Sequence, residues 1–320
     1  MLPLVPKDSC LPSELSYNVF RISHVNNIGL CGRGRVSYMK HWKKQIIAVI
    51  LAAFFCGCHL SNTAVTNGVI DKTENEHVRW GLPGTNGKLL YRLAYVELYD
   101  KEKKEPLWVS YHLTKDRLFG TQKRSDKFEP DPDLSYGDRA ELSDYYRSGY
   151  DRGHMCPAAD NVFNFLAMKE CFYLSNMIPQ KHSLNNGKWK ELEVRIRNYV
   201  KAKDEAWVIS GPIFQKVNEE DIKKIGRVWV PTHCYKIVAY NEGSELKAVG
   251  FIMRNDNETA DLTSYVLKIK DIEEVTGLDF FKKLSEDSDK RVVEAVNKAG
   301  EFWDHSNFPG KVTYRKSFSY

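Results

Sequence analysis

The sequence predicts an α+β fold with a mostly antiparallel central sheet, in a single domain over residues 76–320. Three observations support this prediction. Short runs rich in Tyr, Leu, Val and Ile recur along the chain, amphipathic helical segments are fewer, and the two do not alternate as parallel βαβ units require. The chain has 320 residues, 42% of them hydrophobic, which is enough apolar material for a packed core and argues against wholesale disorder.

The predicted elements begin with a hairpin, in which Leu89–Tyr99 pairs with Leu107–Leu113 around the charged turn 100–106. Residues 120–150 are polar and rich in Pro and Gly, so they predict a long loop of the kind that is often functional. Apolar residues at helical spacing predict an amphipathic helix over 187–202. The other predicted strands and helices are 207–210, 227–230, 235–240, 248–253, 279–284 and 291–299.

The N-terminal part predicts a targeting segment. A basic stretch at Met39–Lys44 precedes ten apolar residues, which is about half the length that a membrane-spanning helix needs. We therefore expect a signal peptide at 39–58, a polar tether at 59–75, and an upstream segment, 1–38, that is non-native or disordered. Gly57-Cys58 resembles a bacterial lipoprotein signal, so the alternatives are a lipidated Cys58 that tethers the chain to a membrane and ordinary export. Both predict a bacterial periplasmic, cell-surface or secreted protein, and a short buried helix is the third alternative.

The formal charge of +5 comes entirely from the N-terminal part. The first 70 residues hold seven Lys and Arg against two acids, and the remainder holds 40 of each sign. Any site for a polyanion must therefore be a local patch, because the domain has no overall positive field.

The densest group of reactive residues is Asp151-Arg-Gly-His-Met155. On an extended segment Arg152 and His154 point to the same side, because side chains alternate along a strand. A neutral imidazole is the side chain best suited to deprotonate water near neutral pH, and a guanidinium beside it can clamp a phosphate with two hydrogen bonds. The group is suited to attack on a phosphodiester.

The predicted helix adds a second group. Asn185, Trp189, Glu193 and Arg197 are each four residues apart and follow one stripe, and Glu193 and Arg197 form an acid-to-base pair in the favourable order. A neutral carbonyl oxygen such as that of Asn185, together with water, suits Mg²⁺, which keeps much of its hydration shell.

Each signal has an ordinary alternative. His154 alone could be a surface or core residue, Glu193–Arg197 a solvated ion pair, and Asn185-Asn-Gly a turn. A further alternative is zinc, although the spacing of the ligand candidates matches no compact zinc motif. Those candidates are His154, Cys156, Cys171 and His182. Which of Cys156, Cys171 and Cys234 bond, if any, stays open.

The order of the motifs resembles the DNA/RNA non-specific endonuclease family, which includes secreted bacterial nucleases and mitochondrial endonuclease G. The likeness is carried by Asp151-Arg-Gly-His-Met, Ser175-Asn-Met-Ile-Pro-Gln180 and Asn185-x-Gly-x-Trp189-x-x-Leu-Glu193. Weaker matches are Arg124–Asp131, Ser210–Phe214, Val230–Lys236 and Thr276–Phe281. This resemblance implies a ββα-metal nuclease fold, in which a strand pair carries the base and the next helix carries the metal ligand.

The resemblance also implies roles for individual residues. His154 corresponds to the general base, Asn185 to the direct Mg²⁺ ligand, and Glu193 to the acid that reaches the metal through water; Mn²⁺ or another divalent cation is the alternative cofactor. Three arginines correspond to groups that contact the scissile phosphate or order the site: Arg124, Arg152 and Arg197. Asn176 and Gln180 are expected to support substrate binding.

The expected function is metal-dependent, sequence-non-specific cleavage of DNA, RNA or both, with 5′-phosphate ends. The alternatives are a phosphodiesterase of the same fold that acts on small nucleotides, and a surface lipoprotein that binds nucleic acid without cutting it. Five residues supply local positive charge near the predicted site: Lys181, Lys188, Lys190, Arg195 and Lys201. They either contact a nucleic-acid substrate or form a solvated helix face. Strand preference, biological role and oligomeric state stay open.

Overall fold

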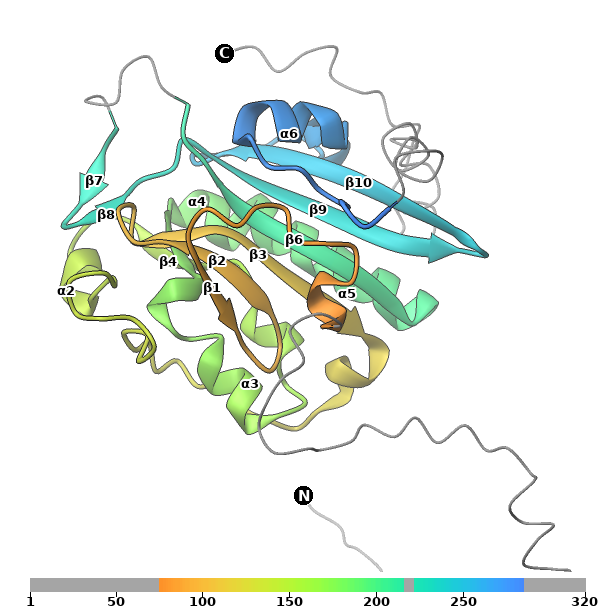
Figure 1. Cartoon of the computed structure of the whole chain (residues 1–320), viewed down its shortest axis with the longest axis horizontal. Helices are drawn as coiled ribbons and strands as arrows, with labels where there is room; N and C mark the ends of the chain where they lie inside the picture. Colours follow the sequence, from red (N-terminus) through yellow and green to blue (C-terminus); the bar gives the residue numbers. More distant parts are fainter. Residues whose placement is uncertain (1–74, 216–221, 285–320) are drawn as a thin grey trace, which may run out of the picture. The chain divides into compact units, whose positions relative to one another are not determined.

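The computed structural model describes residues 75–215 and 222–284 (Figure 1). The upstream segment 1–38, the signal segment 39–58 with Cys58, all but the last residue of the tether 59–75, and the predicted helix 291–299 lie outside these residues.

A seven-stranded antiparallel sheet forms the centre of the domain, which confirms the predicted fold class. Its strand order is β1-β2-β3-β6-β9-β10-β11. The strands are β1 (Lys88–Tyr91), β2 (Val96–Asp100), β3 (Glu105–Thr114), β6 (Glu205–Ile213), β9 (His233–Glu242), β10 (Glu245–Arg254) and β11 (Val266–Leu267).

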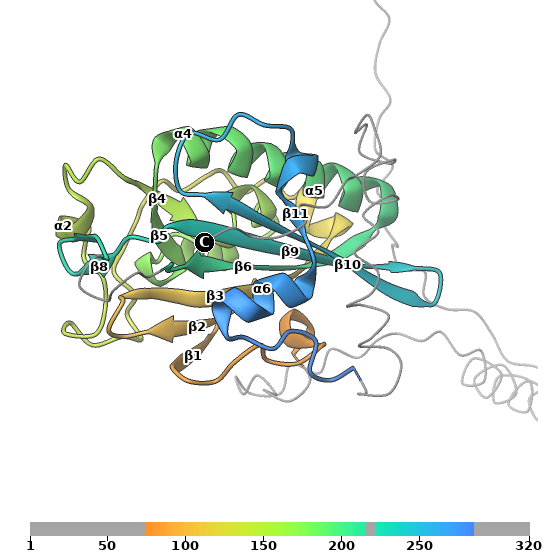
Figure 2. The ribbon, with the colours of Figure 1, turned by 90° about the horizontal axis from the view of Figure 1, so that it is seen from above.

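Both faces of this sheet are covered by helices. Successive residues of each strand point to opposite sides, so one strand contributes side chains to two separate cores. Tyr111 of β3 faces a core that includes Leu192 and Ile196 of the long helix α5 (Lys190–Lys203). Trp108 of the same strand faces a second core that includes Ile272 of α6 (Ile269–Thr276). Figure 2 shows the two helices on opposite sides of the sheet.

Small elements complete the described part. The short helices and turns are η1 (Glu76–Val78), η2 (Lys115–Phe119), α2 (Leu142–Tyr145), η3 (Ala158–Asp160), α3 (Phe165–Glu170), η4 (Leu174–Asn176), α4 (His182–Leu184), η5 (Asn185–Trp189) and η7 (Leu262–Tyr265). Two further ribbons pair β4 (Asp151–His154) with β5 (Met177–Gln180) and β7 (Lys224–Ile225) with β8 (Val228–Trp229). Within residues 75–215 and 222–284, no helix is long and apolar enough to cross a membrane.

Several predicted boundaries are corrected. The hairpin is confirmed as β2 and β3, but the single strand expected at Leu89–Tyr99 is two strands, since the chain turns between them where the Arg92 amide donates to the Tyr95 carbonyl. The helix expected at 279–284 is wrong: these residues form a loop and turns, and the helix lies earlier, at α6. Gly277 ends α6 in the left-handed conformation, φ 69°, which stops the helix.

Candidate active site

The β4–β5 ribbon presents the first half of the site. Arg152 pairs with Pro179 and His154 with Met177, so the two functional side chains lie on one face, as alternation along a strand requires. Gly153 between them is needed for packing: a Cβ there would lie 2.1 Å from Oε1 of Gln180. Any other residue at this position would force the buried Gln180 side chain to move.

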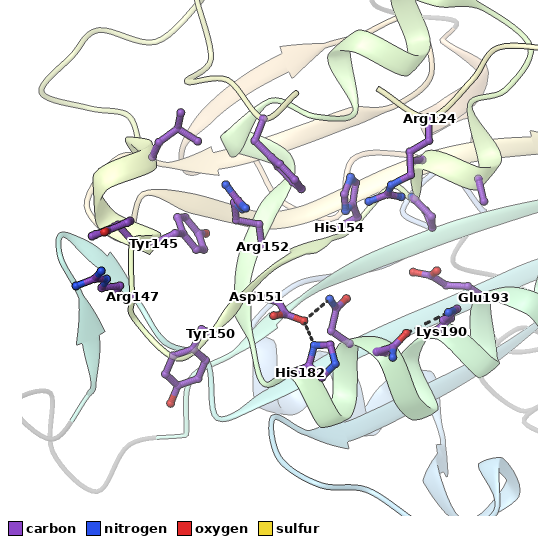
Figure 3. Close-up of a pocket in the computed structure, with 18 of the residues that line it drawn as sticks. Arg124, Tyr145, Arg147, Tyr150, Asp151, Arg152, His154, His182, Lys190 and Glu193 are labelled. Atoms are coloured by element: carbon purple, nitrogen blue, oxygen red, sulfur yellow. Dashed lines mark hydrogen bonds and ion pairs between the residues drawn. The ribbon is translucent and has the colours of Figure 1, made fainter. Parts of the chain in front are cut away.

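His154 lies at the inner wall of a pocket of about 870 Å³ (Figure 3). It is 9% exposed, with its ring edge-on to Phe172 at 4.9 Å and tilted to Phe128 at 5.6 Å between centroids. Its Nε2 has no hydrogen-bond partner among the described residues. Burial, and then the positive charges of Arg124 and Arg152, lower the pKa of His154 to about 3. The imidazole is therefore neutral and able to accept a proton.

Asn185 lines the same pocket and comes from the helical segment that follows β5. It begins η5, a π-helical turn that joins α4 to α5, and such turns are frequent at functional sites. Its amide Nδ2 donates to Oδ2 of Asp151 at 2.9 Å, and that oxygen is also 2.8 Å from Nδ1 of His182. Because Asp151 engages the nitrogen, the Asn185 oxygen is the side-chain atom left to serve as a ligand.

A buried group of alternating charges lies under one end of the pocket. Arg197 is 3.0 Å from Asp160 and 4.0 Å from Glu193, and both Glu193 and Arg197 line the pocket. Burial raises the pKa of Glu193 to about 7, against the opposing effect of Lys236 and Arg197. The predicted Glu193–Arg197 pair is thus mostly buried and part of a larger network, whereas the alternative was a solvated surface bridge.

Lys236 is the residue of this network that sequence reasoning missed. It lies on β9 and is fully buried, with Nζ 2.8 Å from Oγ of Ser210 and 4.3 Å from the ring centroid of Trp189. Trp189 in turn donates from Nε1 to the His154 carbonyl at 3.4 Å. A single lysine inside the apolar run Tyr235–Tyr240 was the signal that could have revealed it.

Arg124 and Arg152 reach the pocket from the loop and from β4. The Arg152 guanidinium lies 4.1 Å from the centroid of Phe128, and that of Arg124 lies 5.0 Å from Phe172. Arg124 also contacts Asp126 at 2.5 Å. Figure 3 shows the Arg124 guanidinium directed toward the His154 ring and Arg152 on the other side of that ring.

Asn176 and Gln180, expected to support substrate binding, lie elsewhere. Both are fully buried and neither lines the pocket. Asn176 bonds only to backbone: it donates to the carbonyls of Cys156 and Cys171 at 3.0 and 2.8 Å and accepts from the Cys156 amide at 2.8 Å. Gln180 donates to Sγ of Cys234 at 3.4 Å. Both side chains therefore support the β4–β5 ribbon from its buried side and do not face the pocket.

The three described cysteines are free thiols, each buried. Cys156 and Cys171 do not line the pocket, whereas His154 and His182 do, so the four zinc-ligand candidates do not converge on one site. Other pocket residues that sequence reasoning did not single out are Leu142, Tyr145, Tyr146, Arg147 and Tyr150.

The oxygen ligands in the pocket fit a hydrated divalent cation. Asn185 offers one neutral oxygen and Glu193 one carboxylate, and both line the cavity. Among the residues that the structure describes, no three His, Cys, Asp or Glu side chains cluster as a metal cage. An ion held here would keep several water ligands, as small hard cations do.

A β-ribbon that carries a histidine, followed by a helix that carries an asparagine in the same pocket, defines a ββα-metal nuclease fold. The sequence profile of the DNA/RNA non-specific endonucleases matches residues 73–287, and the chain belongs to this family of divalent-metal-dependent hydrolases.

Individual relatives agree with this assignment. Mitochondrial nuclease EXOG of Xenopus laevis is 38% identical over 222 residues, which are 65% of this chain and 62% of the frog protein. The chain thus spans less than two thirds of that relative. Nuclease C1 of Cunninghamella echinulata is 38% identical over 65% of this chain and 88% of its own. A chain of the solved EndoG/EndoGI complex has a TM-score of 0.62 and 28% identity, covering 68% of this chain and 95% of its own.

The expected bacterial export is wrong. The matched proteins include EXOG and endonuclease G of Homo sapiens and a nuclease of Saccharomyces cerevisiae, all mitochondrial by name. The composition of the segment, a basic stretch before about ten apolar residues, indicates a targeting signal. Composition alone does not distinguish a signal for export from a signal for another compartment. A lipid tether at Cys58 has no support from these relatives.

Proposed function

We propose that this chain is a metal-dependent endonuclease that hydrolyses the backbone of DNA and RNA without sequence preference and leaves 5′-phosphate ends. One observation carries the proposal: His154 and Asn185, which come from different elements, line one pocket together with Arg124, Arg152 and Arg197. A neutral base, a neutral metal ligand and several guanidinium groups are the set that phosphodiester hydrolysis needs.

His154 acts as the general base. Its Nε2 takes a proton from the water that attacks phosphorus, the bond from phosphorus to the 3′ oxygen breaks, and the leaving oxygen gains a proton from solvent. Before substrate binds, Arg124 and Arg152 help to keep the ring neutral by lowering its pKa. The anionic phosphodiester offsets those two charges, so His154 becomes a stronger base when the substrate is bound.

The guanidinium groups hold the reacting phosphate. Arg152 follows from the same strand as the base, and packing on the Phe128 ring limits its freedom. Planar guanidinium groups match phosphate oxygens with paired hydrogen bonds and stabilise the charge that develops at phosphorus. Contacts of this kind read the backbone and not the bases, which accounts for the absence of sequence preference.

Asn185 would bind the proposed Mg²⁺ directly, and Glu193 would hold it through a water molecule. When bound, this ion supplies charge stabilisation to the phosphate and the leaving oxygen. Asp151 contributes by orienting the Asn185 amide, and the π-turn places that amide at the cavity wall.

The relatives support a mitochondrial location for the chain, which fractionation of native cells tests.

The activity is tested by incubating the purified protein with supercoiled plasmid and with single-stranded RNA, with Mg²⁺ or with excess EDTA. We expect nicked and then linear plasmid, and fragmented RNA, only where Mg²⁺ is present. Cleavage that persists in EDTA, or no cleavage of either polymer, would overturn the proposal. End-labelling with and without prior phosphatase treatment identifies the 5′ phosphate.

A further inference from the structure

One end of the active-site pocket carries cations that the catalytic account does not use. Figure 3 shows Tyr150 and Arg147 at this end, away from Glu193 and His154. Nζ of Lys181 lies 4.5 Å and Nζ of Lys223 lies 4.9 Å from the centroid of the Tyr150 ring. We call Arg147, Tyr150, Lys181 and Lys223 the Tyr150 cluster; Arg147 and Tyr150 line the pocket itself.

The cations of this cluster are not paired with acids of the described part of the chain. Arg147, Lys181 and Lys223 make no ion pair with any residue that the structure describes. Two acids of neighbouring elements are engaged with other residues: Asp151 with Asn185 and His182, and Asp144 with Arg227. Lys181 and Lys223 thus bring two ammonium groups to one ring, and Arg147 lies on the same loop as Tyr150, with its guanidinium 5.1 Å from the centroid of the Tyr146 ring. This end of the pocket is therefore a local positive patch that suits an anion.

The backbone under the cluster is firmly held. The Lys181 amide donates to Oδ1 of Asn255 at 2.8 Å, and the Lys223 carbonyl accepts from the Val230 amide at 2.8 Å. Arg147 has a φ of 52° in the turn after α2, a conformation that a non-glycine residue adopts only at a cost. These residues come from three separate elements, so their convergence is a property of the fold.

Contacts between α2 and the β7–β8 ribbon bring the parts of the cluster together. The Arg227 backbone amide donates to Oδ1 of Asp144 at 3.0 Å, and its guanidinium lies 3.3 Å from Oδ2. In Figures 1 and 2, α2 and β8 lie side by side at the same end of the domain. Lys223, which immediately precedes β7, is thereby placed beside the loop that carries Arg147 and Tyr150.

We propose that the Tyr150 cluster binds backbone phosphates of the nucleotides next to the scissile bond, so that the substrate strand leaves the pocket between α2 and α4. This inference rests on the proposed function and deepens it: it makes a polynucleotide, and not a small diester, the preferred substrate. The cations act through counterion release, which is independent of sequence. The Tyr150 ring holds the two ammonium groups near each other through cation–π contact.

The test is the salt dependence of binding to a short oligothymidylate, measured by fluorescence anisotropy in EDTA so that no cleavage occurs. The double variant Lys181→Gln/Lys223→Gln should lower the slope of log K against log salt by about 1.4, since each phosphate contact on a single strand contributes about 0.7. Lys181→Arg/Lys223→Arg, which keeps both charges, should retain the wild-type slope.

Lys203→Gln is the matched control, because Lys203 is an exposed lysine at the far end of α5. It should leave the slope unchanged. A wild-type slope in the double glutamine variant, or an equal loss in Lys203→Gln, would overturn the inference. Hydrolysis of bis(4-nitrophenyl) phosphate by the wild type reports the catalytic centre separately. If it and plasmid cleavage are absent while the slope still falls, the proposed catalysis fails and the binding surface stands.

Discussion

The carboxylate of Asp151 accepts a hydrogen bond from the side-chain amide of Asn185, 2.9 Å between Nδ2 and Oδ2, and so determines which end of that amide is free. The two residues are 34 positions apart and belong to different elements, β4 and η5. This bond links the strand that carries the base to the turn that carries the metal ligand.

Asp151→Ala should therefore weaken metal binding. Loss of a residue that orients a metal ligand costs roughly 10- to 100-fold in affinity, so the Mg²⁺ concentration for half-maximal cleavage should rise by that factor. Asp151→Asn keeps an acceptor oxygen, so its Mg²⁺ concentration for half-maximal cleavage should lie between that of Asp151→Ala and that of the wild type. The measurement is Mg²⁺ titration of plasmid cleavage, with calorimetric titration in parallel. An unchanged Mg²⁺ requirement in Asp151→Ala would show that the bond has no such role.

Lys236 should be coupled to Glu193 in stability. Removal of one partner from a buried charge group costs about 3–5 kcal/mol, because the other charge is left uncompensated. Lys236→Met should lower the free energy of unfolding in urea by that amount, and Lys236→Met/Glu193→Gln should lose less than the two single changes together. Additive losses in this cycle would contradict the network.

Asn176→Ala should damage the fold and not substrate contact. The change leaves three buried backbone groups without their partner, each worth about 1–3 kcal/mol, so the free energy of unfolding should fall by at least about 3 kcal/mol. Asn186→Ala, a change at an exposed asparagine, is the control and should be neutral. If Asn176→Ala instead has the stability of the wild type but binds DNA more weakly, the structural role is contradicted and a substrate contact is supported.

His77 should make the protein less stable in mild acid. Its Nδ1 accepts from the His112 amide and its Nε2 contacts the Leu93 carbonyl, an arrangement that requires a neutral ring. Burial, and then Arg117, lower the pKa of His77 to about 3, so below pH 6.5 the unfolded chain binds a proton that the native state does not. Stability then falls by up to about 1.4 kcal/mol per pH unit as the pH drops from 6.5 toward 3.

The measurement is urea unfolding of the wild type and of His77→Gln between pH 7 and pH 4. The variant lacks this titrating group, so the difference in stability between the two proteins should shrink as the pH falls. A difference that stays constant over the range would contradict the lowered pKa.

The sequence could predict those features that depend on local pattern. Two runs rich in Tyr, Leu and Val around a charged turn predicted the β2–β3 hairpin, and the spacing of Leu192 and Ile196 predicted α5. The motif order placed His154 and Asn185 in one site, and both line the same pocket. The boundaries of the elements were harder to predict. Residues 89–99 are rich in Tyr, Leu and Val from end to end, which hid the turn between β1 and β2, and the π-turn shifted the start of α5 to Lys190.

What the sequence could not predict is which polar groups are buried. Lys236, Asn176 and Gln180 are fully buried, although lysine, asparagine and glutamine are mostly exposed in proteins. Their burial depends on partners far along the chain, such as Ser210 for Lys236. The Tyr150 cluster is of the same kind, because its members come from three elements that only the folded chain brings together.

The central claim is that His154 is the base of a phosphodiester hydrolase, and turnover of supercoiled plasmid by His154→Ala tests it most directly. The variant should bind the oligonucleotide in EDTA within a few-fold of the wild type, while its cleavage rate in saturating Mg²⁺ should fall by about 10²–10⁴-fold, the usual contribution of a general base. A near wild-type cleavage rate in a correctly folded His154→Ala would contradict the account.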